Sequence, residues 1–293
     1  MNDPALRDRL LAAYATGPAI NAGPGRLPRR EQVVALCDQV LALLFPGCFA
    51  EPVDGCDLGR WVDARLDRLA DDLRAMAEGA LAATGGEPAQ AGDLAREALL
   101  DLIEVRHLVA SDVDAAFAND PAAAERATIV LAYPSIQALA IQRFAHRLYR
   151  RGMPVLPRLM TEVLHARTGI DIHPGARIGE RCFIDHGTGV VVGETAVIGS
   201  HCVLYQGVGL IAWNPLARDE HGELRRGSGN QRHPRLEDHV TVYAGASILG
   251  GDTVIGHHSV IGGNVWLTHS VEPWSVVTID DPQLRIRKRR TQG

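Results

Sequence analysis

The sequence has few aromatic residues and no excess of positive charge. Phe, Trp and Tyr make up 5% of the 293 residues, and 30 Lys and Arg stand against 35 Asp and Glu, for a net charge of −5. Proteins that bind nucleic acid are normally basic, so this composition argues against a nucleic-acid partner. No apolar run approaches the roughly 18 residues of a membrane span, and the N-terminus lacks the basic leader and apolar run of a signal peptide. We therefore expect a cytoplasmic protein with no membrane partner.

The cysteines are too few and too scattered for a disulfide framework. The chain has five, an odd number, and none forms a CxxC pair. Unpaired thiols are typical of a reducing cytosol. What the chain does contain is 46% hydrophobic residues and 30 glycines. This composition supports a sizeable buried core and indicates a repetitive, tightly turning backbone.

The first part of the chain has helical periodicity. Apolar residues recur at three- and four-residue spacing, which predicts helices over 29–45, 58–84, 93–110, 135–151 and 154–167. Ser111, with an acid three residues later, is similar to a capping box and predicts the start of a further short helix. We assign these apolar stripes to the core or to subunit contacts rather than to a functional site.

After Gly169 a period of six replaces the helical period. Two series of mostly aliphatic residues, each six apart, comprise Ile172, Ile178, Ile184, Val190, Ala196, Cys202 and Val208, then Val242, Ile248, Val254, Val260 and Trp266. The neighbours of the second series keep the same step: Tyr243, Leu249, Ile255, Ile261 and Leu267. Such a hexapeptide repeat builds a β-solenoid, in which three hexads form a triangular coil, the repeated residue points inward and the coils stack. We therefore predict an α + β-solenoid fold, with a helical domain over 1–168, the solenoid over 169–276 and a basic tail over 277–293.

The two series are out of step with each other. Val208 and Val242 are 34 residues apart, which is not a multiple of six. The segment 212–231 between them is polar and aperiodic, so we predict a loop that protrudes from the solenoid. Long ordered loops in compact domains are usually functional; a disordered insertion is the alternative.

Four runs resemble motifs of one family. The runs DIHP at 171–174 and DHGTGVVVGETA at 185–196 look like the signature of the serine O-acetyltransferases, which are hexapeptide-repeat acyltransferases. RHP at 232–234 and DPA at 120–122 are similar to two further motifs of that family. The long segment before RHP resembles a longer-loop branch.

The resemblance implies a fold and an activity. The fold is a left-handed parallel β-helix that forms a homo-oligomer, a trimer or a dimer of trimers, with active sites between neighbouring subunits. The activity is transfer of an acetyl group from acetyl-CoA to the hydroxyl of L-serine, which gives O-acetylserine for cysteine biosynthesis. Acetyl-CoA is a co-substrate, and no metal is expected.

The same resemblance assigns catalysis to two residues. His186 is the expected general base, since an imidazole titrates near working pH. Asp171, 15 residues earlier, matches the carboxylate that orients the family's base and stabilises its imidazolium form. The hydroxyl would attack the thioester directly, without a covalent acyl-enzyme.

A zwitterionic acceptor needs both signs of charge. By resemblance, Asp120 and Asp185 hold the ammonium group, while Arg232 and His233 hold the carboxylate, which Arg grips with a planar fork. Acetyl-CoA is expected along the later coils, where small residues allow close approach of its pantetheine arm. The residues expected there are Tyr243, Ala244, Gly245, Ala246 and Gly250.

Each of these residues also has a purely structural alternative. Without the motifs, the histidine of the DHG run is ordinary solvated surface and the acid before it caps a turn. Asp120, followed by proline, fits a helix N-cap. Arg232 could pair with Glu237 or with an acid of the loop. Glu194 matches a family carboxylate without a definite role.

Three other functions remain open. The rivals are a hexapeptide acetyltransferase for homoserine or a sugar, a zinc-dependent hydration enzyme on the same solenoid, and a non-catalytic scaffold. The chain has 12 histidines but no H-x4-H pair, which weighs against the zinc enzyme.

The C-terminal tail differs from that of many family members. Many of them dock a C-terminal Ile into O-acetylserine sulfhydrylase, whereas this chain ends in Gly293, so we do not expect that complex in its usual form. The basic cluster at 285–290 is expected to be a solvated tail or a contact for CoA phosphates.

Overall fold

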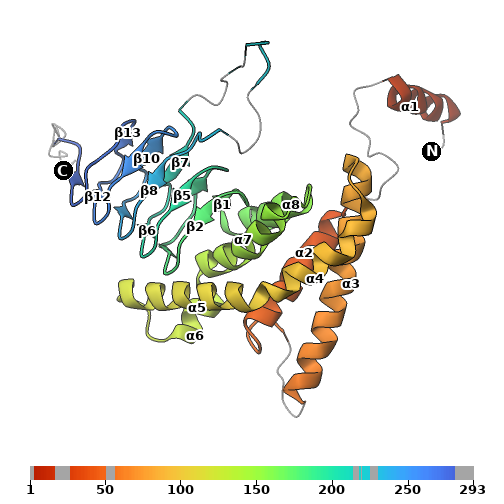
Figure 1. The fold of residues 1–293 in the computed structure, drawn as a ribbon, viewed down its shortest axis with the longest axis horizontal. Helices are drawn as coiled ribbons and strands as arrows, with labels where there is room; N and C mark the ends of the chain where they lie inside the picture. The colour runs from red at the N-terminus through yellow and green to blue at the C-terminus, as the bar shows by residue number, and fades with distance from the viewer. Residues whose placement is uncertain are drawn as a thin grey trace, which may run out of the picture. The chain divides into compact units, whose positions relative to one another are not determined.

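The computed structural model describes residues 3–16, 27–50, 57–213, 218, 220–224 and 230–280. It divides into two compact units: one comprises 1–106 and 140–163, and the other 107–139 and 164–293. Along the chain, helices come first and short strands follow (Figure 1). None of the described helices is both long and apolar enough to span a membrane. The basic cluster and half of the predicted loop lie outside the described residues.

The described helices are α1 (Pro4–Thr16), α2 (Arg30–Leu44), α3 (Leu58–Thr84), α4 (Ala91–Leu100), α5 (Leu102–Asn119), α6 (Arg126–Ala132), α7 (Pro134–Arg150) and α8 (Leu156–Thr168), with a 3-10 turn at Pro88–Gln90. Helices α2, α3, α7 and α8 begin and end within two residues of the predicted bounds, whereas the apolar periodicity did not predict α1 and α6. Helix α3 matches its prediction because both ends are capped. The Asp57 carboxylate accepts the N–H of Gly59 at 2.8 Å, and Gly85 ends the helix at φ 78°.

Two helix predictions are wrong in detail. The segment 93–110 is not one helix, because α4 ends before Asp101 and α5 begins after it. Ser111 does not open a helix but lies inside α5. Its hydroxyl donates to the carbonyl of Leu108 at 2.6 Å and accepts the N–H of Arg181 at 2.9 Å. The serine therefore joins α5 to the first coil instead of capping a helix.

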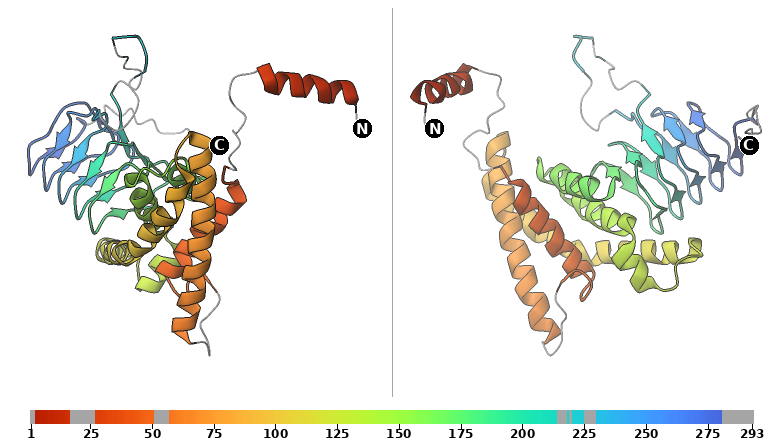
Figure 2. Two further views of the ribbon diagram at one scale, coloured as in Figure 1. Left: turned by 45° about the vertical axis from the view of Figure 1, so that its right-hand side comes forward. Right: turned by 180° about the vertical axis from the view of Figure 1, so that it is seen from behind.

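The second unit contains the predicted solenoid, a stack of short parallel strands in three sheets (Figure 2). Sheet A contains β1 (Asp171–Ile172), β4 (Val191–Val192), β7 (Gly209–Ile211), β10 (Ser247–Leu249) and β13 (Trp266–Leu267). Sheet B contains β2 (Arg177–Ile178), β5 (Val197–Ile198), β8 (Arg235–Leu236) and β11 (Val254–Ile255). Sheet C contains β3 (Phe183–Ile184), β6 (Val203–Leu204), β9 (Thr241–Val242), β12 (Val260–Ile261) and β14 (Val276–Val277). Strands β1 to β13 therefore visit A, B and C in turn, as a triangular β-helix requires. Between β13 and β14 a parallel bridge from Ile255 to Val271 takes the place of a strand in sheet B.

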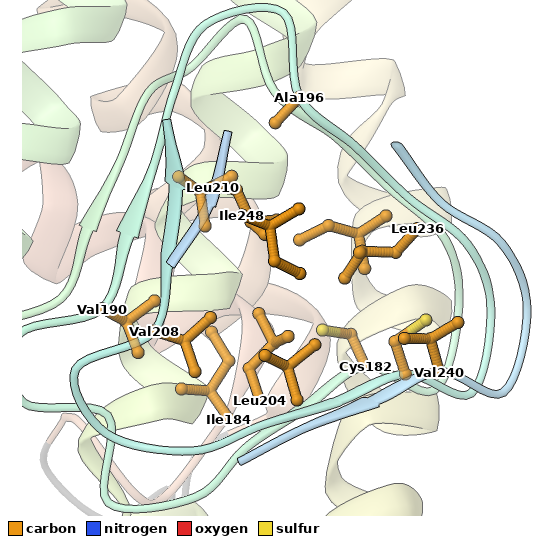
Figure 3. Close-up of a cluster of buried hydrophobic side chains, with 14 of the residues drawn as sticks. Cys182, Ile184, Val190, Ala196, Leu204, Val208, Leu210, Leu236, Val240 and Ile248 are labelled. Carbon is orange, nitrogen blue, oxygen red and sulfur yellow. The ribbon is translucent and has the colours of Figure 1, made fainter. Parts of the chain in front are cut away.

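The interior of the prism is filled with aliphatic side chains (Figure 3). Ile184, Leu204, Leu210 and Ile248 come from different coils and point toward a common centre, each 1% exposed or less. Each such side chain contributes about 1.5–3 kcal/mol on burial. Cys202 belongs to this core, as predicted, and burial raises the pKa of its thiol to about 12.

The usual step from the start of one strand to the start of the next is six residues, but some steps are longer. Strand starts are eight residues apart from Phe183 to Val191 and seven apart from Ser247 to Val254. The seven-residue step shifts the phase of the later coils, so the prediction that Val254, Val260 and Trp266 point inward is wrong. Their neighbours at 255, 261 and 267 are buried instead, and Trp266 is 64% exposed.

Between β7 and β8 the chain leaves the coil, as the broken period predicts. The described part of 212–231 includes an antiparallel bridge from Arg218 to Leu224. The chain returns at β8, which pairs with β5, while β10 pairs with β7. The excursion therefore leaves the stacking of the coils intact.

Helix α5 covers the backbone at one end of the prism. Asp112, in the middle of α5, is fully buried, and its Oδ1 accepts the N–H of Cys182 at 2.9 Å. In the next coil, the counterpart of Arg181 is His201, and its N–H is accepted by the carbonyl of Glu180 in the preceding coil, whereas the N–H of Arg181 is accepted by Ser111 of α5. A buried amide without a partner is costly, so α5 supplies acceptors that a preceding coil would otherwise provide.

Replacing Asp112 with Ala should destabilise the second unit by about 1–3 kcal/mol, because it leaves the Cys182 amide buried without an acceptor. The measurement is chemical unfolding of wild type and variant. Asp114→Ala on the same helix is the matched control, since Asp114 pairs with Arg126 at 2.7 Å on a largely exposed surface and should cost less than about 1 kcal/mol. Equal losses in the two variants would contradict the capping role.

Candidate active site

The eight-residue step lies at the corner between β3 and β4, which we call the histidine corner (residues 185–189). Asp185 and Tyr205 occupy equivalent places, since the N–H of each donates to a carbonyl of the next coil, at 2.8 and 3.0 Å. Thr188 and Gln206 are equivalent in turn, because each carbonyl accepts an N–H from the following coil, at 3.0 and 2.9 Å. Residues 186–187 have no counterpart. The inserted pair is therefore the predicted base and the glycine after it.

The insertion is accommodated by a tight turn centred on His186. The N–H of Gly187 donates to the carbonyl of Asp185 at 2.6 Å, and His186 has φ 57°, as in a γ-turn. His201 and His239 have a similar φ, of 59° and 61°, so the left-handed backbone alone does not distinguish His186; the two inserted residues and the γ-turn do. The imidazole is 72% exposed, and its Nδ1 lies 3.7 Å from Oδ1 of the mostly buried Asp185. The turn thus presents the ring to solvent beside a carboxylate.

Asp120 lies on the loop between α5 and α6, where both its oxygens have donors. Oδ1 accepts the N–H of Ala122 at 2.8 Å, and Oδ2 accepts the phenol of Tyr133, which precedes α7. The loop is held by Arg126, which pairs with Asp114 and lies over the ring of Phe117 at 4.4 Å. Helix α6 begins only at Arg126, so the N-cap alternative for Asp120 is wrong.

The Asp120–Tyr133 pair is electrostatically linked to the histidine corner. Donation from Tyr133 lowers the pKa of Asp120, and the nearby His186 acts in the same direction. The hydrogen bond to Asp120 raises the pKa of Tyr133 to about 12, and Asp185 contributes in the same sense. The structure therefore brings together Asp120, Asp185 and His186, three of the residues predicted from sequence.

Two tyrosines continue the histidine corner along the prism axis. Tyr205 and Tyr243 follow β6 and β9 and stack with ring centroids 4.9 Å apart. Burial raises the pKa of Tyr205, and Tyr243 and Asp185 act in the same direction. Of the positions predicted to contact acetyl-CoA, Tyr243 is 45% exposed, whereas Ala246 lies fully inside the prism.

Asp171, the predicted orienting carboxylate, lies in β1 at the start of sheet A. It is half-buried and pairs with Val191 in the neighbouring strand, its N–H donating to the carbonyl of Val190 at 2.9 Å. Val191 follows directly after the histidine corner. Asp171 is thus part of the regular ladder, whereas His186 is on the insertion.

Arg232 and His233 lie at a different corner of the prism, between sheets A and B. We call residues 193–195 and 231–233 the arginine corner. The Arg232 guanidinium forms an ion pair with Glu194, and both side chains are mostly buried. Arg232 therefore pairs with Glu194 and not with Glu237, which was one of its two structural alternatives; the carboxylate of Glu237 accepts the N–H of His257 at 2.8 Å.

His233 is held neutral at this corner. Burial lowers the pKa of its imidazole to about 4, and the neighbouring Arg232 acts in the same direction. Its Nδ1 lies 2.9 Å from the hydroxyl of Thr195. Sequence reasoning assigned no role to Thr195 or Tyr133. The first lies within the DHGTGVVVGETA run and the second just before a proline, and both gain meaning only from the hydrogen bonds they form.

Comparison with known proteins points to one family. A scan of protein-family models finds no match to the chain. Among curated proteins, a plasmid-encoded serine acetyltransferase of Synechococcus elongatus is 43% identical over 264 residues, 86% of this chain and 82% of the relative. The serine acetyltransferase of Mycobacterium tuberculosis is 41% identical over 169 residues, 57% of this chain and 67% of the relative.

Solved structures agree with the sequence comparison. Serine acetyltransferase isoform 3 of Entamoeba histolytica, crystallised with cysteine, is 33% identical with a TM-score of 0.74 over 96% of this chain and 93% of that one. The Neisseria gonorrhoeae serine acetyltransferase, crystallised with serine, is 26% identical with a TM-score of 0.55 over 84% of this chain and 97% of that one. The fold and the histidine corner, together with these relatives, define the class of protein: a hexapeptide-repeat acyltransferase, built on a left-handed parallel β-helix. Within that class, the chain belongs to the serine acetyltransferase family.

Gly187→Ala should destabilise the histidine corner more than Gly189→Ala. Both glycines are left-handed, at φ 80° and 79°, so either alanine costs about 1–2 kcal/mol. Only at Gly187 would the new Cβ lie 2.4 Å from Cδ1 of the buried Ile170, which adds about 1–3 kcal/mol of overpacking. Equilibrium unfolding of the two variants measures the difference, and equal stabilities would show that the corner relaxes freely.

Tyr133→Phe should raise the pKa of Asp120, because the phenol donates to the charged carboxylate. The measurement is a carbon-13 NMR titration of the Asp120 carboxyl in both proteins. Tyr205→Phe is the control, since that phenol makes no hydrogen bond to Asp120 among the described contacts. An Asp120 that titrates identically in wild type and Tyr133→Phe would refute the assigned coupling.

Proposed function

We propose that this protein is a serine O-acetyltransferase, transferring acetyl from acetyl-CoA to the hydroxyl of L-serine. The observation that carries the proposal is the insertion of His186 into the β-helix corner beside Asp185, near enough to Asp120 to lower the pKa of that carboxyl. A base and two carboxylates at one place suit an acceptor with an ammonium group and a hydroxyl. We place the reaction in the cytoplasm, which the free state of the four described cysteines supports.

In the proposed mechanism His186 is the general base. Its imidazole removes the proton as the serine oxygen attacks the thioester carbonyl, which forms a tetrahedral intermediate. The intermediate collapses to O-acetylserine as the imidazolium returns the proton to the departing CoA sulfur. Asp171 orients the base, and Asp185, 3.7 Å from Nδ1, stabilises its charged form.

The acceptor is held by charges from two corners. Asp120 and Asp185 bind the ammonium group at the histidine corner, and Arg232 and His233 bind the carboxylate at the arginine corner. In one protomer these corners lie at opposite ends of the strands of sheet A, since one joins sheet C to sheet A and the other joins sheet A to sheet B. We therefore propose a homo-oligomer, a trimer or a dimer of trimers, in which the two corners of neighbouring copies meet.

Acetyl-CoA is proposed to lie along the later coils, beside the Tyr205–Tyr243 stack. Gly245 and Gly250 are left-handed, at φ 72° and 98°, and a Cβ on Gly245 would lie 2.4 Å from Oδ1 of Asn264. These positions keep the backbone close to the surface, which supports contact with the pantetheine arm through Tyr243, Ala244 and the two glycines.

The test is loss of the acetyl-CoA thioester absorbance with L-serine, L-homoserine, L-threonine or a galactoside as acceptor. Turnover is expected with L-serine, and His186→Ala should lower kcat about 10²–10⁴-fold, the usual contribution of a general base. His201→Ala, a histidine at another corner, is the control and should keep wild-type kcat. Turnover with a different acceptor would contradict the substrate, and an active His186→Ala would contradict the base.

A further inference from the structure

The hydroxyl of Thr195 lies at the centre of the hydrogen bonds of the arginine corner. Thr195 is 8% exposed and follows Glu194 directly. Its Oγ1 accepts the backbone N–H of Arg232 at 2.8 Å and that of His233 at 3.1 Å. Backbone N–H groups can only donate, so they occupy the two lone pairs of the hydroxyl oxygen. The hydroxyl hydrogen is then free to be donated to Nδ1 of His233, 2.9 Å away.

The same contacts fix the tautomer of His233. The backbone N–H of Thr195 also donates to Nδ1, at 3.2 Å. A ring nitrogen that accepts a hydrogen bond carries no hydrogen, so the neutral ring has its hydrogen on Nε2. The lowered pKa, about 4, keeps the ring neutral at physiological pH. The other ionisable groups that face it are Arg232, Glu194 and His173.

The ring and the backbone around it are tightly packed. A Cβ on Gly193 would lie 2.0 Å from Nε2 and 1.9 Å from Cδ2 of His233, so the ring edge lies directly over the glycine Cα. The Gln231 amide donates to the carbonyls of Thr195 and His233, at 2.7 and 2.5 Å. Residues 231–233 are thus bound to Thr195 through both its backbone and its side chain.

We propose that Thr195 is a positioning residue for acceptor binding: it fixes the 232–233 turn and holds the hydrogen of His233 on Nε2, as a neutral donor to the acceptor carboxylate beside Arg232. This inference rests on the proposed function, in which Arg232 and His233 bind that carboxylate. Because Arg232 is already paired with Glu194, a neutral His233 adds direction rather than charge. The site then favours a planar carboxylate placed for two donors.

The first test reads the tautomer without activity. Nitrogen-15 NMR of histidine-labelled protein at pH 7 distinguishes protonated from unprotonated ring nitrogens, and His233→Gln identifies the signals of His233. Wild type should show hydrogen on Nε2. Thr195→Val, which removes the hydroxyl at constant size, should raise the pKa of His233 and introduce the Nδ1–H form, while Thr195→Ser should match wild type. Hydrogen on Nδ1 in wild type would overturn the proposal whether or not the valine variant folds.

The second test is kinetic. Thr195→Val should raise KM for L-serine about tenfold, the effect of losing roughly one hydrogen bond to a charged group, while kcat changes less than about threefold. Thr195→Ser should restore KM to within about twofold. A wild-type KM in a folded Thr195→Val protein would overturn the proposal, as would a loss of kcat alone. If wild type itself fails to acetylate L-serine, the proposed function fails, and the tautomer result still decides the assignment of Thr195.

Discussion

A coil of six residues per face, with one inward aliphatic side chain at each step, is the constraint on which the rest of the structure depends. The parallel ladders stack only if every coil repeats that step, so any additional residue must leave the prism. Residues 186–187, the segment 212–231 and the single extra residue before Val254 are such departures. The buried core thereby determines where side chains are displayed. His186, the proposed base, is exposed on a corner that is two residues longer than the coil requires.

Charge at the two corners is arranged in different ways. At the histidine corner, Tyr133 keeps the Asp120 carboxylate ionised and oriented, while His186 remains exposed. At the arginine corner, the cation is paired with Glu194 and the imidazole of His233 is neutral. One corner therefore offers negative charge beside an exposed imidazole, and the other offers directed donors. This division suits the two ends of an amino acid.

Much of the fold and part of the site could be predicted from sequence, because periodicity and local motifs depend on near neighbours in the chain. The helical stripes, the six-residue period and the DHGTG run are of this kind. The phase shift that exposes Trp266 did not follow from the pattern, because positions 254, 260 and 266 and their neighbours 255, 261 and 267 both recur at six residues. The roles of Asp112, Tyr133 and Thr195 could not be predicted either, because their hydrogen-bond partners lie 13 to 70 residues away in the chain. Such contacts follow from packing rather than from local pattern.

The central claim is that the histidine corner of one copy and the arginine corner of another serve one acceptor. The most direct measurement is L-serine acetylation by co-expressed His186→Ala and Arg232→Gln chains, compared with each variant alone. Each variant alone should be nearly inactive. In randomly mixed oligomers, about one quarter of shared sites would contain both intact corners, so activity should recover toward that fraction of wild type. Mixed oligomers no more active than the separate variants would contradict the account.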